Sequence, residues 1–167
     1  PACIGSCIGS GYKRTICVTG DGSAVMNMQE LEVIRRLNLP VKLFISDNQG
    51  YSMIWHSQKG NFEGRLTGCT RASGLTLPDM QRIAEAFGIY AIRINAKSEL
   101  EPGVRNILEY DGPAVGIVRT DISQKVLPKQ SSYMNKAGQM ESRPLHDMVP
   151  LLSRDELLAC MPGQERG

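Results

Sequence analysis

The sequence contains no run of basic residues, no internal repeat and no low-complexity segment among its 167 residues. Without a basic run, nothing indicates a nucleic-acid or anionic-membrane partner, because such partners are bound by clustered Lys and Arg. The longest apolar stretches are far too short to span a bilayer as a helix. What is present, 41% hydrophobic and 22% charged residues with a net charge of +2, is typical of a soluble globular domain with a sizeable core.

The sequence also lacks a metal-type cysteine cluster, because its five cysteines are an odd number without the spacing of such a site. Cys3 and Cys7 stand four residues apart and could share one face of a helix. They could act there as a redox pair, as half of a zinc site, or as small buried apolar residues. We favour the packing interpretation. Unpaired cysteines suit a reducing compartment, so we expect a cytoplasmic protein.

Short β-forming stretches alternate with helix-like stretches along most of the chain. We expect strands over 15–19, 41–45, 90–94 and 114–118, and helices over 27–38, 78–87 and 98–110, with residues 1–11 as the tail of a helix that begins earlier. This alternation predicts an α/β fold of three αβα layers, with a mostly parallel, doubly wound sheet.

Sequence signals also predict how some elements begin and where the domain ends. Asn27 with Glu30, and Ser98 with Glu101, have the spacing of capping boxes. Residues 51–77 have weak periodicity, which predicts a long loop with room for a short helix. We expect one domain over residues 1–150, followed by a C-terminal tail over 151–167 with a short helix at 154–160.

Two polar turns stand directly after the first two predicted strands: Gly20-Asp21-Gly22-Ser23 and Asp47-Asn48-Gln49-Gly50. One helical crossover separates the two strands, so the turns are expected to meet at the carboxyl edge of the sheet, where such folds bind ligands. Carboxylate and amide oxygens suit magnesium or calcium, and magnesium usually completes its shell with phosphate oxygens and water. Glycines let the backbone approach a phosphate, and Ser23 adds a hydroxyl.

The two turns therefore predict a site for a magnesium-bridged diphosphate. A helix follows the first turn, and its N-terminus would face the same anion. The alternative is a flavodoxin-like sheet in which both turns are ordinary connections.

The first turn, Gly20-Asp21-Gly22, followed one strand later by Asp47-Asn48, is similar to the signature of thiamine diphosphate enzymes. The surrounding residues, GDGSAVMNMQEL and NLPVKLFISDNQGY, resemble the C-terminal cofactor-binding domain of acetolactate synthase-like enzymes. The resemblance continues through GPAVGIV and VLP, and so covers residues 1–130.

This resemblance implies thiamine diphosphate and Mg²⁺ as cofactors. The implied metal ligands are Asp21, Asn48 and the backbone carbonyl of Gly50. The implied cofactor-binding residues are Gly20, Asp21, Gly22, Ser23, Asn48, Gly50 and Tyr51. Asp47 departs from the pattern, because many members have Asn there, but that position is not the usual metal ligand.

The resemblance further implies an enzyme that decarboxylates a 2-oxo acid and transfers the two-carbon adduct to an acceptor. The alternatives are a 2-oxo acid decarboxylase, which is a lyase of the same family, and a non-catalytic nucleotide-binding or regulatory module. Family members place their catalytic glutamate in an N-terminal domain, which a partner subunit presents across a homodimer or tetramer. We therefore expect no catalytic residue in these 167 residues and no activity from them alone. Whether a further domain binds FAD stays open.

Two residues of the predicted loop have open roles. His56 could act on substrate as an acid or base, or it could be a solvated loop residue. Trp55, like Tyr51, flanks the site and could line a pocket, but Trp55 does not keep the spacing of the pocket tryptophan of true acetolactate synthases.

Overall fold

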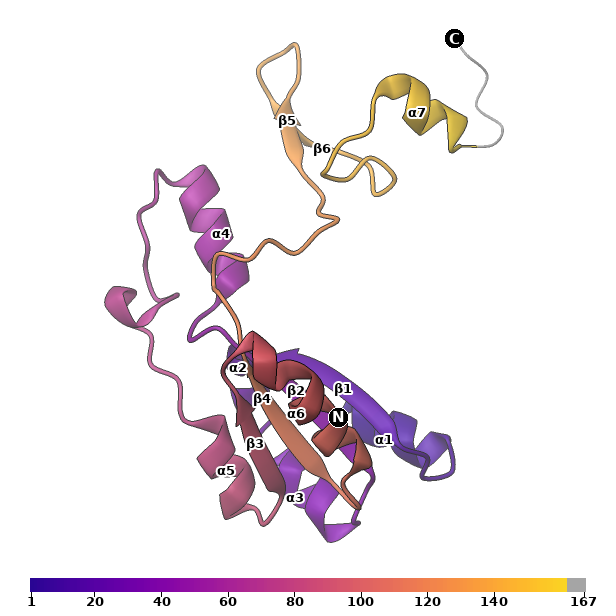
Figure 1. Cartoon of the computed structure of the whole chain (residues 1–167). Coiled ribbons are helices and arrows are strands. Elements are labelled where there is room, and N and C mark those ends of the chain that lie inside the picture. Colours follow the sequence, from indigo (N-terminus) through magenta and orange to yellow (C-terminus); the bar gives the residue numbers. More distant parts are fainter. Residues whose placement is uncertain (162–167) are drawn as a thin grey trace. The chain divides into compact units, whose positions relative to one another are not determined.

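Four strands form one parallel sheet in the computed structural model, which describes residues 1–161 (Figure 1). They are β1 (Thr15–Gly20), β2 (Val41–Asp47), β3 (Tyr90–Ile94) and β4 (Ala114–Arg119), in the order β1-β2-β4-β3. Each is rich in Val, Ile or other residues that favour a pleated, half-buried surface. All four predicted strands are confirmed, and β1 and β2 are parallel neighbours, with Gly20 opposite Ser46.

Helices cover both faces of this sheet. The helical elements of this part are α1 (Ala2–Gly9), α2 (Asp21–Val25), α3 (Glu30–Arg36), α4 (Ser52–Asn61), the 3₁₀ turn η1 (Arg71–Ser73), α5 (Met80–Ala86) and α6 (Lys97–Glu109). Residues of α1, α3 and α5 pack in one core with Ile45 and Ile117. Side chains alternate between the faces of a strand, so Phe44 and Gly116 belong to the other face, where Ile107 of α6 lies against Gly116. The predicted three-layer αβα fold is confirmed.

The two N-terminal cysteines are packing residues in this fold. Cys7 is fully buried in the core, and its thiol donates to the carbonyl oxygen of Lys13 at 3.5 Å. Cys3 packs against the same core. Among residues 1–161, no three His, Cys, Asp or Glu side chains come together in a group that could hold a metal. The packing interpretation of Cys3 and Cys7 therefore holds.

Both predicted capping boxes are wrong. The chain already winds helically from Asp21 in α2, with Asn27 N–H bonded to the carbonyl of Ala24, and the predicted helix over 27–38 is shortened to α3. Gln29 precedes α3, and its side chain makes no capping bond. At α6, the carboxylate of Glu99 accepts from the backbone N–H groups of Asn95 and Ala96, at 2.8 and 3.2 Å. That helix therefore begins one residue before Ser98.

The predicted loop over 51–77 holds more regular structure than its sequence indicates. Helix α4 occupies Ser52–Asn61 and buries none of its residues, which explains why no apolar periodicity marks it. A backbone bridge between Gly50 and Thr70 then ties the start of the segment to η1. Among residues 1–161, no helix combines the length and apolar character that crossing a bilayer requires.

Contacts within the chain divide it after Ser123, whereas the sequence placed the boundary at residue 150. The second unit contains a small antiparallel pair, β5 (Ser132–Met134) and β6 (Met140–Ser142), and α7 (Arg154–Ala159). Its buried carboxylate, Asp147, pairs with Arg143 and Arg154 at 2.9 and 3.1 Å. These ion pairs connect residues within the second unit, and apolar periodicity does not reveal them. The expected short helix is present as α7, and residues 162–167 of the expected tail lie outside the described part.

A buried lysine secures the edge of the sheet where β2 and β4 begin. Lys42 is only 1% exposed, and its ammonium donates to the carbonyl oxygens of Tyr110 and Gly112, the latter at 2.6 Å. These carbonyls belong to the connection between α6 and β4. Burial lowers the pKa of Lys42, and the nearby Arg14 lowers it further. The lysine thus compensates for its desolvation with hydrogen bonds that fix this connection.

We predict that Lys42→Met lowers the free energy of unfolding by about 1–3 kcal/mol, because Met fills similar space but leaves the carbonyl groups without their donor. Chemical denaturation followed by circular dichroism measures the change. Lys13→Met is the control, because the Lys13 side chain is exposed. Equal stability of the two variants would contradict a structural role for the buried ammonium.

Candidate functional site

The two polar turns lie together at the carboxyl edge of the sheet. Strand β1 ends at Gly20 and Asp21 opens α2, while Asp47 ends β2 and is followed by Asn48. The strands are parallel and adjacent, so both turns leave the sheet at the same edge. The backbone N–H of Gln49 donates to Asp21 Oδ2 at 2.7 Å and joins the turns directly.

Asp21 is a buried carboxylate held by backbone groups. It is 3% exposed, and its other oxygen, Oδ1, accepts from the N–H of Gly22 at 2.8 Å. Burial raises the pKa of Asp21 above its ordinary value, and the negative charge of Asp47 adds to that rise, while backbone hydrogen bonds oppose it. A cation bound to this carboxylate would relieve the same penalty, because an opposite charge favours the ionised form.

Asn48 provides the clearest sign of a ligand. Its Oδ1 atom is buried and has no hydrogen-bond partner. A buried polar atom without a partner is rare in proteins, and an ion or water at the site is the usual explanation. An amide oxygen without a donor, a buried carboxylate and the backbone of the same turn are the oxygen donors that magnesium prefers. The residues present therefore fit that metal.

Both turns are closely packed, and two glycines make this packing feasible. A Cβ atom on Gly22 would lie 2.1 Å from Cε1 of Tyr51, so the tyrosine ring rests on the start of α2. A Cβ atom on Gly50 would lie 2.4 Å from the backbone oxygen of Cys69, which accepts from the N–H of Tyr51 at 2.9 Å. Gly50 and Tyr51 are thus fixed between α2 and the chain before η1.

A cavity of about 230 Å³ adjoins the first turn. Ser23 and Thr19 contribute to its wall, and its apolar lining comes from both helices and strands, including α1, α3, β1 and β2. The residues around it are Pro1, Ala2, Cys3, Cys17, Val18, Thr19, Ser23, Ala24, Asn27, Met28, Glu30, Leu31, Ile34, Leu43 and Met80. This mixture of apolar walls and a few polar groups is common in small-molecule sites.

Sequence reasoning missed a basic residue beside the second turn. Arg93 of β3 lies 2.9 Å from Asp47 and 2.6 Å from Asp79, measured between guanidinium nitrogens and carboxylate oxygens. The signal was an arginine inside the otherwise apolar strand YAIRI, in register with the buried Ile117. A charged side chain at such a position needs a partner, and Asp47 supplies it.

Trp55 and His56 lie on α4, not on a loop. Their rings meet edge to face with centroids 5.0 Å apart, and the ammonium of Lys59 lies 5.1 Å from the centroid of the Trp55 ring. Both residues are half-buried. Their roles stay open.

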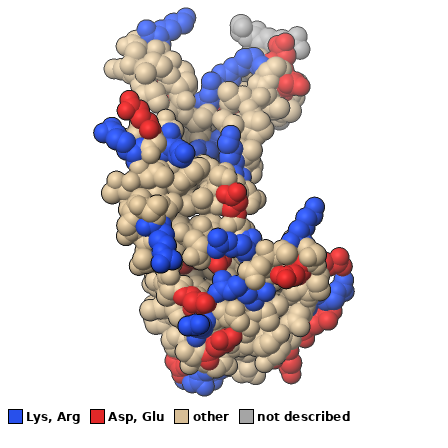
Figure 2. Space-filling model, turned by 60° about the vertical axis from the view of Figure 1, so that its left-hand side comes forward, with Lys and Arg blue, Asp and Glu red and all other residues tan. Residues whose placement is uncertain are grey.

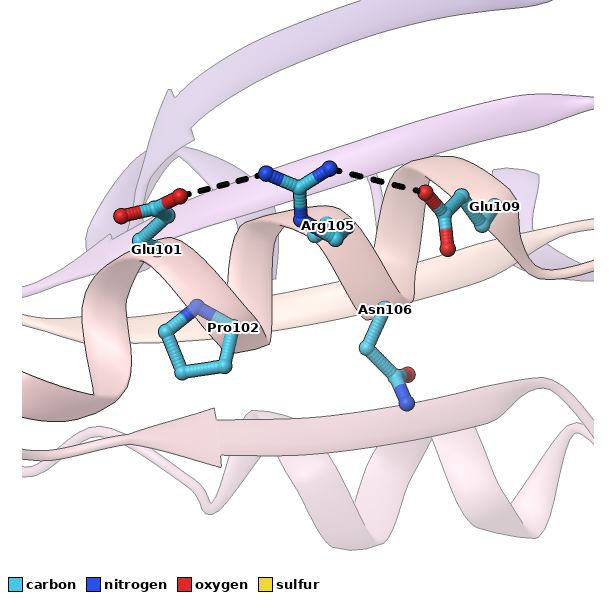
Figure 3. Close-up of a pocket in the computed structure, with 5 residues that line it drawn as sticks. All are labelled: Glu101, Pro102, Arg105, Asn106 and Glu109. Carbon is cyan, nitrogen blue, oxygen red and sulfur yellow. Dashed lines mark hydrogen bonds and ion pairs between the residues drawn. The ribbon is translucent and has the colours of Figure 1, made fainter.

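Other surface features do not resemble a site. On α6, a hollow of about 350 Å³ is surrounded by Arg105 and its two carboxylate partners, Glu101 and Glu109 (Figure 3). These exposed side chains form ion pairs with one another. On the face shown in Figure 2, acidic and basic side chains are interspersed, without a large patch of one sign.

Comparison with known proteins identifies the family of the chain. The family model described as "Thiamine pyrophosphate enzyme, C-terminal TPP binding domain" matches residues 1–118. The chain belongs to this family. Its matched residues include β1, β2 and both turns, so the resemblance drawn from the sequence is confirmed.

Relatives of this thiamine pyrophosphate enzyme domain include acetolactate synthases. The chain is 34% identical over 128 residues to acetolactate synthase isozyme 2 large subunit of Escherichia coli (strain K12), covering 77% of this chain and 23% of the relative. It is 35% identical over 115 residues to the acetolactate synthase large subunit of Porphyra purpurea (69% and 19%), and 34% identical over 132 residues to the chloroplastic acetolactate synthase 2 of Zea mays (77% and 21%).

The chain spans about a fifth of the length of these curated relatives. It is therefore a thiamine diphosphate-binding domain of the acetolactate synthase-like kind. The ligand roles of its individual residues stay predictions.

We predict that Gly50→Ala lowers the free energy of unfolding by about 1–3 kcal/mol, because the methyl group would overlap the Cys69 carbonyl and the backbone must move. Gly60→Ala in α4 is the matched control, because nothing lies within 4 Å of its added methyl. That change should stabilise the helix by roughly 0.5–1 kcal/mol. Thermal unfolding of both variants measures the difference, and a neutral Gly50→Ala would show that this turn tolerates displacement.

Proposed function

We propose that this domain binds thiamine diphosphate through Mg²⁺ in an enzyme that decarboxylates a 2-oxo acid and transfers the two-carbon adduct to an acceptor. The observation that carries the proposal is the unpartnered Oδ1 of Asn48, in the turn that is hydrogen-bonded to the buried carboxylate of Asp21. The acetolactate synthases among its relatives support the choice of reaction.

Three groups of this chain would hold the metal: the Asp21 carboxylate, the Asn48 amide oxygen and the Gly50 backbone carbonyl. Only Asp21 carries a formal charge. Asp21 is already oriented by the N–H groups of Gly22 and Gln49, so it needs little rearrangement to bind a cation. Diphosphate oxygens and water would complete the octahedral shell of Mg²⁺.

The first turn and Tyr51 would hold the diphosphate. Gly20 and Gly22 expose backbone to an approaching phosphate, and Ser23 offers a hydroxyl beside the adjoining cavity. The Tyr51 ring, packed on Gly22, would keep water from one side of the turn. When bound, thiamine diphosphate supplies a carbon nucleophile and an electron sink. This chain's contribution is to fix the position of the charged end of the cofactor.

In our proposal, other groups that the reaction needs come from outside these residues. We place the catalytic glutamate in the N-terminal domain of a partner subunit, so that the active enzyme is a homodimer or tetramer. The residues of this chain then act by binding and orientation, and the chain alone does not turn over substrate. A cytoplasmic location agrees with its free cysteines.

We predict that Asp21→Ala, in the intact protein, abolishes magnesium-dependent binding of thiamine diphosphate, because it removes the only charged ligand. Asn48→Ala should weaken binding less severely, since it removes a neutral ligand. Calorimetric titration of the cofactor at fixed Mg²⁺ measures both effects. Asp111→Ala is the control, because Asp111 is exposed in the connection to the start of β4. Unchanged affinity in Asp21→Ala would refute the assignment.

We further predict that the intact protein, given pyruvate with saturating Mg²⁺ and thiamine diphosphate, forms acetolactate as its main product. Mass spectrometry of the reaction mixture identifies the product. Acetaldehyde without acetolactate would instead indicate a 2-oxo acid decarboxylase. Magnesium-independent binding of a nucleotide, with no binding of thiamine diphosphate, would indicate a regulatory module and overturn both enzymatic proposals.

A further inference from the structure

A single guanidinium holds both ends of a long surface segment beside the predicted metal turn. Arg93 pairs with Asp47, the last residue of β2, at 2.9 Å and with Asp79, the residue before α5, at 2.6 Å. Residues 48–78, which include the rest of the second turn, α4 and η1, run between these carboxylates. We call Asp47, Arg93 and Asp79 the Arg93 clamp.

The Asp47 end of the clamp reaches the second turn. The Asp47 side chain is 5% exposed, and its Oδ1 accepts a hydrogen bond from the side-chain amide of Gln49. Gln49 has a φ of 59°, a left-handed conformation that residues other than glycine adopt rarely. Its backbone N–H is bonded to Asp21. Gln49 is therefore held on one side by the clamp and on the other by Asp21, with Asn48 and Gly50 as its chain neighbours.

The Asp79 end of the clamp is anchored in α5. Asp79 Oδ1 caps this helix by accepting from the N–H of Gln81 at 2.9 Å and of Arg82 at 3.4 Å. Met80 and Ala84 of α5 belong to the core. Asp21, Asp47, Asp79 and Arg93 also line one small cavity of about 20 Å³. The clamp thus connects the packed core to the immediate surroundings of the predicted ligand.

The charges in this cluster are divided unequally. Asp21 and Asp47 are both buried, yet in the described chain only Asp47 has cationic partners: Arg93 at 2.9 Å and Arg119 at 3.9 Å. The hydrogen-bond donors of Asp21 in the described chain are backbone N–H groups. Because Asp47 is already paired with Arg93, a divalent cation would meet one carboxylate without a cationic partner, that of Asp21.

We propose that Arg93 is a positioning residue for magnesium. Through Asp47 it holds the Asn48–Gly50 turn in its metal-binding form. Through Asp79 it couples this form of the turn to the ordering of residues 48–78. This inference rests on the proposed function. It assigns roles to Asp47, Arg93 and Asp79 that the resemblance did not imply. Because one guanidinium binds a carboxylate at each end of the segment, loosening one end should loosen the other.

The test compares Arg93→Met with Arg105→Met in the intact protein. Arg105 is a matched control, because it also bridges two carboxylates but does so on the exposed surface of α6 (Figure 3). Calorimetry at a fixed concentration of thiamine diphosphate gives the magnesium dependence of binding. Hydrogen exchange with mass spectrometry reports the order of peptides at both ends of residues 48–78.

For Arg93→Met we expect the apparent dissociation constant for Mg²⁺ to rise about 10- to 100-fold, as for other losses of groups that orient metal ligands. Cofactor binding at saturating Mg²⁺ should recover, because the ligands remain. Exchange should become faster at both ends of the segment together. Arg93→Lys should have a dissociation constant for Mg²⁺ between those of Arg93→Met and the unaltered protein, since it keeps the charge but loses the guanidinium fork that binds two carboxylates. Arg105→Met should match the unaltered protein.

A second variant keeps the test valid if Arg93→Met does not fold. Asp79→Ser retains a cap for α5 but removes one side of the clamp, and it should speed exchange near Asp47 as well as near Asp79. If Arg93→Met, or Asp79→Ser in its place, behaves like Arg105→Met in both measurements, the positioning role is wrong. If the unaltered protein shows no magnesium-dependent binding of thiamine diphosphate, the proposed function itself fails.

Discussion

The hydrogen bond from the backbone of Gln49 to the carboxylate of Asp21 is the contact on which the arrangement of the site depends. It joins two turns that are distant in sequence and adjacent only because β1 and β2 are parallel neighbours. The crossover through α2 and α3 brings the second strand back in the same direction. The apolar residues of that crossover thus determine indirectly which polar groups face each other at the edge of the sheet.

Two buried carboxylates in the site are stabilised in different ways. Two carboxylates lie out of solvent at the same sheet edge, and a net charge there is unfavourable unless it is compensated. For Asp47 the compensation is internal, through Arg93. For Asp21 it consists of backbone N–H groups, which orient the carboxylate but leave its charge for a ligand. The two residues have the same side chain and nearly the same burial, so their neighbours set their different roles.

Much of this arrangement could be predicted from sequence, and the failures have physical causes. The four strands were predicted because their residues are β-branched or apolar and lie between turns, and the two turns because parallel strands end at the same edge. The sequence left room for a short helix in residues 51–77 but did not locate α4, because a helix without buried residues has no apolar period. The cap at Asn27 failed because the preceding residues are already helical. The partners of Arg93 lie on β2 and before α5, and no local pattern encodes contacts of that range.

The contact between Gly22 and the Tyr51 ring has a consequence for how this domain can vary in evolution. The missing side chain at position 22 and the ring at position 51 occupy one shared volume. A lineage cannot acquire even a methyl group at position 22 while the ring stays in place. A substitution at position 22 therefore requires the ring at position 51 to move or to be replaced by a smaller side chain, so the two positions should change as a pair, although β2 and the crossover separate them in sequence.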